Sequence, residues 1–332
     1  MALKNLRFVY FCQKNAQNLS FLEMNLQKTP SSPYWIVVVS LFAVILVGMF
    51  VSNFLALVMA LPFVGFDLGK LMLLLENPTS SPANRPIFML IQALTSVGTF
   101  VITPILFYKF YAKDFLEKPK WEFASKLFVL AAVLVLVSMP FNSMVVKWNE
   151  AVQLPDSLSQ FELWASQKEQ LLKKLTLFLV DFDSIYEFLI GLVVVAVVPA
   201  IGEEFLFRGM LQGFLQKTFR NPHAAIWVAG FLFSAFHLQF YGLVPRMLLG
   251  VLFGYFYFWS GNLAVPVVAH FVNNGFTLLL MYLFKLEMID IDIDSPETAP
   301  WEAVLVSVCL ISVLLWGFWK KTSKNLSNPT NF

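Results

Sequence analysis

Long uncharged apolar segments recur along this chain. A bilayer hydrocarbon core about 30 Å thick requires about 20 apolar residues in a helix. Uncharged runs that meet or approach this length occupy residues 35–61, 86–108, 127–146, 224–243, 247–259, 263–284 and 303–319. A further run begins at Phe188 and continues past Gly202 into a charged cluster, so its helix is expected to extend beyond Glu204. The sequence therefore predicts an all-α polytopic membrane helical bundle with about eight transmembrane helices.

The composition agrees with a multi-pass integral membrane protein. Of 332 residues, 58% are hydrophobic and 13% are charged, which is more apolar than a soluble domain of this length. The lipid bilayer is therefore an expected partner. The net charge of +2 is small and the basic residues flank apolar segments, so no nucleic-acid partner is expected. Cys12 and Cys309 lie near opposite ends of the chain and fit neither a disulfide framework nor a metal-binding motif.

Basic residues set the expected orientation. One group lies in residues 1–34, and others follow the second, fourth and eighth predicted helices. Because cytoplasmic loops carry an excess of Lys and Arg, both termini are expected to be cytoplasmic. Residues 147–184 fall on the opposite side, and their apolar spacing predicts an amphipathic helix at the outer interface. Residues 260–262 predict a tight turn between two antiparallel helices.

Three polar clusters interrupt the apolar second half of the chain, and the first contains Glu203, Glu204 and Arg208. Charged groups are costly within a membrane, so each is a candidate functional residue. Glu204 and Arg208 are four residues apart with the acid first, the favoured order for an ion pair on one helix face. Glu203 points about 100° away from Glu204 and has no local cation, which makes it the better general-base candidate. The alternative is a solvated helix end at the cytoplasmic surface.

The other two clusters contain histidine. His237 is expected well inside the fifth predicted helix, one turn after Phe233. A lone buried histidine is more often a hydrogen-bonded core residue than a catalyst. His270 and Asn274 are four residues apart on one helix face, where imidazole and carboxamide can bind water or donate to an oxyanion. A helix-packing role for this pair is the alternative, because such groups also hydrogen-bond across membrane helices.

In chain order, the motifs Glu-Glu-x-x-x-Arg, Phe-x-x-x-His and His-x-x-x-Asn lie on apolar segments. This arrangement resembles the CAAX protease and bacteriocin-processing (CPBP, Abi) family of intramembrane proteases, which includes the type II CAAX prenyl endopeptidases. The resemblance covers residues 191–284. It implies an intramembrane endopeptidase that hydrolyses a peptide bond of a membrane-associated or C-terminal substrate. The implied partner is a membrane-associated protein or peptide.

The resemblance also implies roles for individual residues. Glu203 would activate water, His237 would help to hold it, and His270 with Asn274 would stabilise the tetrahedral oxyanion. Glu204, Arg208 and Phe233 would support the site.

Metal dependence is the main alternative within this resemblance, with zinc bound by Glu203, His237 and His270. The metal-free interpretation, with no cofactor, is favoured because asparagine is a poor zinc ligand and no His-Glu-x-x-His motif is present. Two other functions stay open, a non-proteolytic immunity or scaffold protein and a transporter with an intramembrane proton relay.

These expectations divide the chain into four parts. Residues 1–34 form a cytoplasmic N-terminal segment, and residues 35–183 form the first three membrane helices with the outer amphipathic segment. Residues 184–285 form the catalytic core of helices four to seven. Residues 286–332 form the last loop, helix eight and a cytoplasmic tail.

Overall fold

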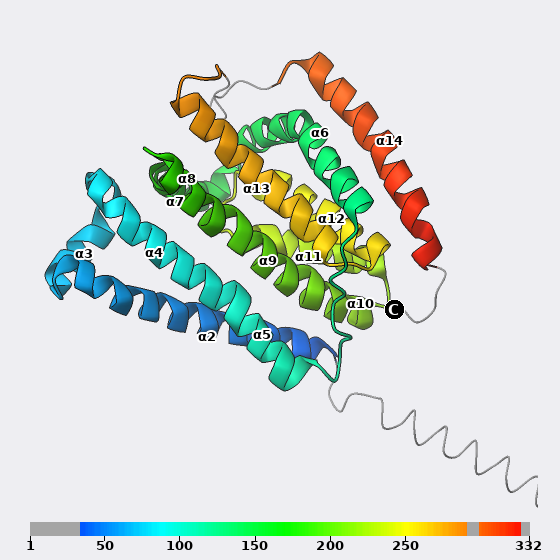
Figure 1. The fold of residues 1–332 in the computed structure, drawn as a ribbon, viewed down its shortest axis with the longest axis horizontal. Coiled ribbons are helices and arrows are strands. Elements are labelled where there is room, and N and C mark those ends of the chain that lie inside the picture. The colour runs from blue at the N-terminus through cyan, green and yellow to red at the C-terminus, as the bar shows by residue number, and fades with distance from the viewer. Residues whose placement is uncertain (1–33, 291–298, 327–332) are drawn as a thin grey trace, which may run out of the picture.

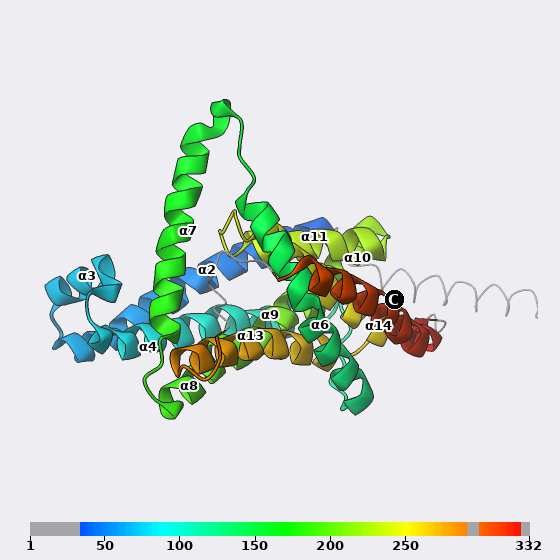
Figure 2. The same ribbon diagram turned by 90° about the horizontal axis from the view of Figure 1, so that it is seen from above.

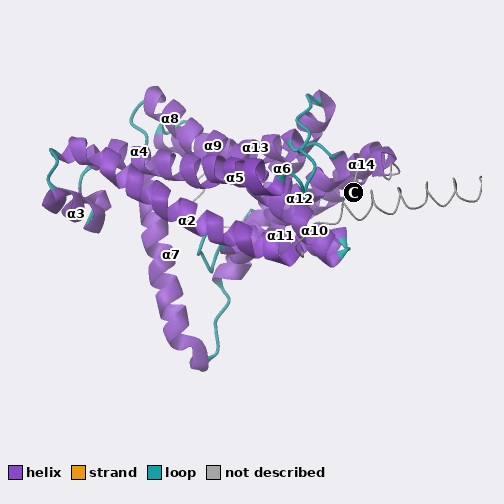
Figure 3. Cartoon of the chain, turned by 90° about the horizontal axis from the view of Figure 1, so that it is seen from below, coloured by secondary structure: helices purple, strands orange, loops and turns teal. Residues whose placement is uncertain are grey.

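The computed structural model describes residues 34–290 and 299–326, and the regular structure within these ranges is entirely helical (Figure 3). The predicted all-α class is confirmed. The α-helices are α2 (Tyr34–Ala60), α3 (Leu68–Glu76), α4 (Arg85–Ser96), α5 (Thr103–Phe107), α6 (Ser125–Glu150), α7 (Ser159–Val180), α8 (Ile185–Gly191), α9 (Val198–Glu204), α10 (Gly213–Phe219), α11 (Pro222–Ala235), α12 (Leu243–Ser260), α13 (Ala264–Lys285) and α14 (Trp301–Leu326).

Several of these helices join end to end through π-helical segments. These are η4 (Val97–Ile102), η5 (Tyr108–Ala112), η7 (Leu192–Val197) and η8 (Phe205–Gln212). Short 3₁₀ turns are η1 (Leu61–Val64), η2 (Pro78–Ser80), η3 (Pro82–Asn84) and η6 (Asp156–Leu158). π-Helical turns are often associated with functional sites. The segment η8 directly follows Glu203 and Glu204 and contains Arg208.

Seven helical stretches of the described chain are long and apolar enough to cross a membrane, judged by length and composition. They are Tyr34–Val64, Pro82–Ala112, Ser125–Glu150, Ile185–Phe219, Leu243–Ser260, Ala264–Lys285 and Trp301–Ser323. They correspond to seven of the eight predicted membrane helices, and the chain is a polytopic helical membrane protein. The predicted segment 1–34 lies, except for Tyr34, outside the described residues, and the cytoplasmic placement of the termini stays a prediction.

The eighth predicted membrane helix, over residues 224–243, is shorter than expected. Helix α11 ends at Ala235, and the chain turns before α12 begins at Leu243. The His237 amide donates to Ser234 O at 3.1 Å, and Leu238 has a φ of 55°, a left-handed conformation that ends the helix. The Ser234 hydroxyl donates to Leu243 O at 2.6 Å and holds the returning chain. The prediction that His237 lies well inside a helix was therefore wrong, because His237 occupies the turn after α11.

Helices α11 and α12 pack closely because glycines face each other. A Cβ added at Gly230 would lie 2.8 Å from Val251 Cγ2, and one added at Gly250 would lie 3.1 Å from Gly230 Cα. The small residues let the two backbones approach, as is typical of membrane helix pairs. This approach places the Gly250 carbonyl beside the polar cluster described below.

The tight turn predicted at residues 260–262 is confirmed. Gly261 has a φ of 63° and ends α12. The Asn262 side chain accepts a hydrogen bond from Glu122 N at 3.2 Å and donates to Glu122 O at 2.8 Å. The loop that follows η5 is therefore attached to the α12–α13 turn at one end of the bundle.

The spanning helices form one bundle (Figure 1). Helix α2 packs against α4. Helix α6 packs against both α13 and α14, and α11 packs against α12. A buried cluster of aromatic and aliphatic side chains joins α2 to η8, α10 and α11, and its members include Phe207, Phe214 and Phe233. The charged segment that follows α9 is therefore enclosed by other helices.

Helix α7 takes a different direction from the rest. Figure 2 shows it running across the direction of α4, α9 and α13. It carries exposed apolar side chains such as Leu163 and Trp164. Its Glu169 accepts a hydrogen bond from Tyr241 N at 3.0 Å, which links α7 to the turn after α11. A helix within the predicted amphipathic segment 147–184 is confirmed, and its position at the outer interface stays a prediction.

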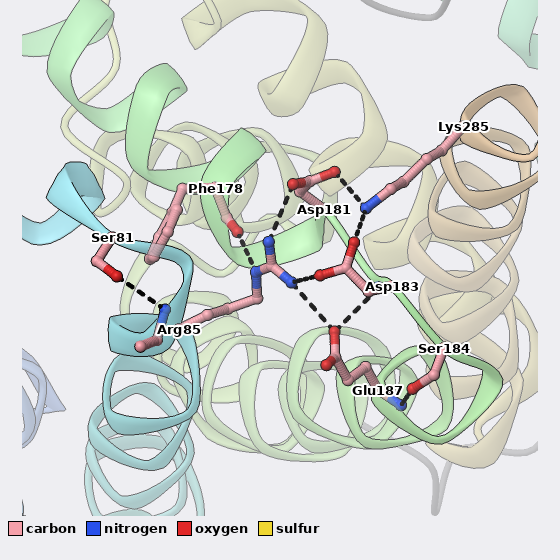
Figure 4. Close-up of polar contacts among 9 residues, drawn as sticks. Ser81, Arg85, Phe178, Asp181, Asp183, Ser184, Glu187 and Lys285 are labelled. Atoms are coloured by element: carbon pink, nitrogen blue, oxygen red, sulfur yellow. Dashed lines mark hydrogen bonds and ion pairs between the residues drawn. The ribbon is translucent and has the colours of Figure 1, made fainter.

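An ion cluster fixes the start of α4 to the α7–α8 connection and to the end of α13 (Figure 4). The buried Arg85 guanidinium lies 2.9 Å from Asp181 Oδ2, 2.8 Å from Asp183 Oδ2 and 3.1 Å from Glu187 Oε2. Lys285 Nζ lies 2.7 Å from Asp181 Oδ1 and 2.6 Å from Asp183 Oδ1. Because these residues come from three separate parts of the chain, the cluster holds tertiary structure at this end of the bundle.

The cluster predicts a stability change at acidic pH. The hydrogen bonds from Lys285 and Arg85 lower the pKa of Asp183 from 3.8 to about 2. Since the folded-state pKa is depressed, the ionised carboxylate contributes stability that is fully present above about pH 4 and is lost as the pH falls toward 2. In detergent, Asp183→Asn is expected to lower the thermal unfolding midpoint at pH 6, and the difference from wild type should shrink between pH 4 and 2. A difference that stays constant over this range would contradict the assignment.

Candidate active site

Glu204 lies at the centre of a buried polar cluster. Its side chain is fully buried at the end of α9. Its Oε1 accepts hydrogen bonds from Arg208 Nη1 at 2.7 Å and from His270 Nδ1 at 2.8 Å. The predicted Glu204–Arg208 contact is confirmed, and the bond to His270 adds a partner 66 residues away in the chain. Glu204 therefore fixes the positions of both Arg208 and His270.

Arg208 is enclosed by groups from several helices. Its Nη2 donates to Gly250 O at 2.8 Å, and its guanidinium carbon lies 4.6 Å from the ring centroid of Phe233 and 5.5 Å from that of Phe253. Cation–π contacts of this kind strengthen when the cation is desolvated. Arg208 is 1% exposed. The alternative of a solvated helix end is therefore excluded for this side chain and for Glu204.

Glu203 faces His270 Nε2, and like Glu204 it has a buried Oε2 with no hydrogen-bond partner among the described residues. The residue is 7% exposed, and its Oε2 is buried with no hydrogen-bond partner among the described residues. This oxygen lies 4.0 Å from His270 Nε2. That separation is too long for a direct hydrogen bond, but one water molecule can bridge two polar atoms at this spacing. Glu203 Oε2 and His270 Nε2 therefore face each other without a direct hydrogen bond.

The ring of Phe233 lies against both histidines. Its centroid is 5.2 Å from that of His237 and 5.9 Å from that of His270, in edge-on arrangements. His237 Nδ1 donates to Phe233 O at 2.9 Å. A carbonyl can only accept, so Nδ1 carries the proton and Nε2 of neutral His237 presents a lone pair. His270 also stacks on Phe253, with centroids 5.3 Å apart. Phe233 thus brings the two histidine motifs to one location.

Asn274 lies on α13 with His270, as predicted, but the two side chains bond to different partners. Asn274 Nδ2 donates to Val195 O at 3.2 Å, and Asn274 Oδ1 accepts from Asn273 Nδ2 at 3.0 Å. Val195 belongs to the π-helical segment η7. This bond is the helix-packing contact that the sequence left as an alternative. A carboxamide has a second N–H, which the bond to Val195 does not use.

The segment that contains all of these motifs matches a known protein family. Residues 185–276 match the family described as type II CAAX prenyl endopeptidase Rce1-like. This segment belongs to the CPBP family. The match covers every predicted site residue, from Glu203 to Asn274.

Two curated relatives align with parts of the same chain. The uncharacterized protein YpbD of Bacillus subtilis (strain 168) is 34% identical over 80 residues, 23% of this chain. The membrane-embedded CAAX protease MroQ of Staphylococcus aureus (strain USA300) is 28% identical over 94 residues, 27% of this chain. In both cases the chain spans 38% of the relative's length. No solved structure matches this chain significantly.

The sequence-based prediction of the site did not include one charged residue of the CPBP segment, Arg246. Arg246 lies in the first turn of α12, and its Nη2 donates to Gln239 Oε1 at 2.7 Å. Its Nη1 is buried with no hydrogen-bond partner among the described residues. It interacts electrostatically with Glu203. The sequence could have indicated Arg246, because it is the only charged residue (Asp, Glu, Lys or Arg) between residues 221 and 284, and charged residues within membrane segments are often functional.

The predicted zinc ligands do not form a metal-binding cluster in this arrangement. Within residues 34–290 and 299–326, no three His, Cys, Asp or Glu side chains are grouped so that they could hold a metal ion. Nδ1 of His270 is bonded to Glu204, and Nδ1 of His237 is bonded to Phe233 O. Each histidine leaves Nε2 without a hydrogen bond to the described residues, as metal-binding histidines also do, so the metal-free interpretation stays a prediction.

Proposed function

We propose that this chain is an intramembrane endopeptidase of the bacterial inner membrane that hydrolyses a peptide bond in a membrane-associated protein or peptide. The observation that carries the proposal is the buried Glu203 oxygen without a partner, 4.0 Å from His270 Nε2. An unsatisfied carboxylate among membrane helices costs free energy, so its retention points to a function. The family match of residues 185–276 supports a proteolytic one.

In the proposed mechanism Glu203 acts as the general base. Its free Oε2 takes a proton from a water molecule, whose oxygen attacks the carbonyl carbon of the scissile bond. The lone pair on Nε2 of neutral His237 accepts the other hydrogen of this water and orients it. The protonated Glu203 then gives its proton to the leaving amine, so that the protons balance over the cycle.

The developing oxyanion requires donors, and α13 supplies the candidates. His270 in its protonated form presents Nε2–H, while its Nδ1–H is held by Glu204 at 2.8 Å. The Glu204 carboxylate stabilises the imidazolium and fixes the ring, as an orienting acid does in hydrolases with a histidine. The unused N–H of Asn274 is the second proposed donor, with its carboxamide oriented by Val195 O. Arg208 in turn holds Glu204.

A zinc-dependent version of the protease is the alternative mechanism. In it, Glu203, His237 and His270 would bind the ion, which would activate the water as a Lewis acid. The metal-free version is favoured here because Asn274 is a poor zinc ligand and the chain has no His-Glu-x-x-His motif.

The proposal is tested by presenting the purified protein, in detergent and in lipid nanodiscs, with a library of internally quenched peptides with and without lipid modification. We expect cleavage of a subset of the library, with new termini identified by mass spectrometry. The matched control is Glu302→Gln, which changes an exposed carboxylate in the first turn of α14 and should leave cleavage unchanged. If neither preparation cleaves any member, the chain is better explained as a non-proteolytic scaffold or immunity protein.

A further inference from the structure

Arg246 is a half-buried cation that no carboxylate of the described residues contacts directly. Its Nη1 has no hydrogen-bond partner among the described residues, and within the same residues it forms no ion pair. Its single side-chain hydrogen bond is to Gln239, a neutral amide. Burying an unpaired charge is costly, whereas a charge that meets an anion on binding recovers that cost. The arrangement therefore favours an anionic group that arrives from outside the protein.

The guanidinium has a defined position at the turn that carries His237. A Cβ added at Gly242 would lie 3.0 Å from Arg246 Nη2 and 3.1 Å from its Nη1, so the guanidinium packs directly over the Gly242 backbone. The carboxylates that interact with Arg246 electrostatically are Glu203 and Glu169, and neither forms an ion pair with it. Arg246 thus interacts electrostatically with the proposed base, while its Nη1 has no hydrogen-bond partner among the described residues.

The backbone N–H groups of Leu243, Val244 and Arg246 at the start of α12 already have acceptors, so they are not available to an incoming anion. In the first turn of α12, Leu243 N donates to Phe240 O at 3.1 Å, Val244 N donates to Asn149 Oδ1 at 2.8 Å, and Arg246 N donates to Gly242 O at 3.2 Å. Pro245 has no N–H. Anion recognition at this position is therefore the task of the Arg246 side chain.

We infer that Arg246 is a substrate-recognition residue that binds a carboxylate of the peptide beside the scissile bond. This inference rests on the proposed protease function. A guanidinium binds carboxylates through two parallel N–H groups, and Nη1 is one such free group. The carboxylate is either the C-terminus of the peptide or an acidic side chain. Both are anions that a guanidinium binds through its N–H groups.

The test uses the peptide library synthesised in matched forms. In the first pair, one peptide ends in a free carboxylate and the other in a carboxamide. In the second pair, one peptide has Glu after the cleavage site and the other has Gln. For Arg246→Gln, KM for the carboxylate form that wild type prefers is expected to rise about 10- to 100-fold, with kcat changed little, because a hydrogen bond to a charged group is lost. The neutral form should be cleaved equally by both proteins. The pair that responds identifies which carboxylate is bound.

Companion variants separate recognition from folding. Arg246→Lys keeps the charge but loses the fork, so it should show an intermediate KM. Gly242→Ala crowds the guanidinium and should raise KM for the carboxylate form alone. Arg220→Gln, at an exposed arginine after α10, is the matched control and should behave as wild type. Equal losses on carboxylate and neutral peptides would overturn the inference, as would a fall in kcat with KM unchanged, which indicates oxyanion stabilisation.

A binding measurement distinguishes failure of this inference from failure of the proposed function. Retention of the labelled carboxylate and carboxamide libraries is measured on nanodiscs that carry Glu203→Gln, with and without Arg246→Gln. The inference predicts preferential retention of the carboxylate library that disappears with Arg246→Gln. Equal retention of the two libraries by Glu203→Gln would contradict it, even if the wild-type protein cleaves peptides. Preferential retention without any cleavage by wild type would contradict the protease and leave carboxylate recognition in place.

Discussion

Replacing Glu203 by glutamine is expected to slow peptide cleavage by about 10²- to 10⁴-fold, the usual contribution of a general base. Glutamine has nearly the same size as glutamate but cannot take a proton from water. The altered oxygen has no hydrogen-bond partner among the described residues, so few protein contacts are lost. Expression and the thermal unfolding midpoint in detergent should therefore stay close to those of wild type.

The measurement is the single-turnover cleavage rate of the best library peptide, with unfolding followed on the same preparations. Glu302→Gln serves as the control for the amide substitution. Retention of more than about a tenth of the wild-type rate would mean that another group activates the water, because it falls short of the loss expected for a general base.

Replacing Glu204 by glutamine is expected to act mainly on stability. Arg208 is 1% exposed, and Glu204 is its ion-pair partner at 2.7 Å. Removing one member of a buried pair leaves the other charge uncompensated and costs about 3–5 kcal/mol. Activity should fall less than in Glu203→Gln, because a glutamine oxygen can still accept a hydrogen bond from His270 Nδ1 while losing the charge that stabilises the imidazolium.

A double variant tests this interpretation. Glu204→Gln combined with Arg208→Met removes both charges, so it should be more stable than Glu204→Gln alone. Thermal and denaturant unfolding in detergent measure the coupling between the two positions. Equal activity losses in Glu203→Gln and Glu204→Gln, with no difference in stability, would show that the roles of the two acids are wrongly assigned.

The sequence predicted what depends on local spacing. The apolar runs located the membrane helices, and the four-residue spacing located the Glu204–Arg208 pair. The sequence could not predict that His270 joins the same Glu204 oxygen, because that contact depends on how α13 packs against α9. The same limit applies to Arg85, whose acidic partners lie about 100 positions away along the chain.

The end of α11 shows a different limit. Residues 236–243 are apolar enough to continue a helix, and apolarity alone placed His237 inside one. A side-chain bond from Ser234 to Leu243 and the left-handed Leu238 end the helix instead, and neither is visible as an apolar pattern. Arg246 was missed for a related reason, since it fell between two predicted helices and its surroundings exist only once the turn has formed.

The most direct test of the central claim, a protease with a glutamate base, is the cleavage rate of metal-stripped protein. A zinc enzyme loses its water activator in strong chelator, whereas a carboxylate base needs only its correct protonation state. We predict that purified protein contains substoichiometric zinc and cleaves its best library peptide at the same rate before and after chelator treatment. Stoichiometric zinc, together with inactivation by chelator that added zinc reverses, would contradict the account and make Glu203, His237 and His270 metal ligands.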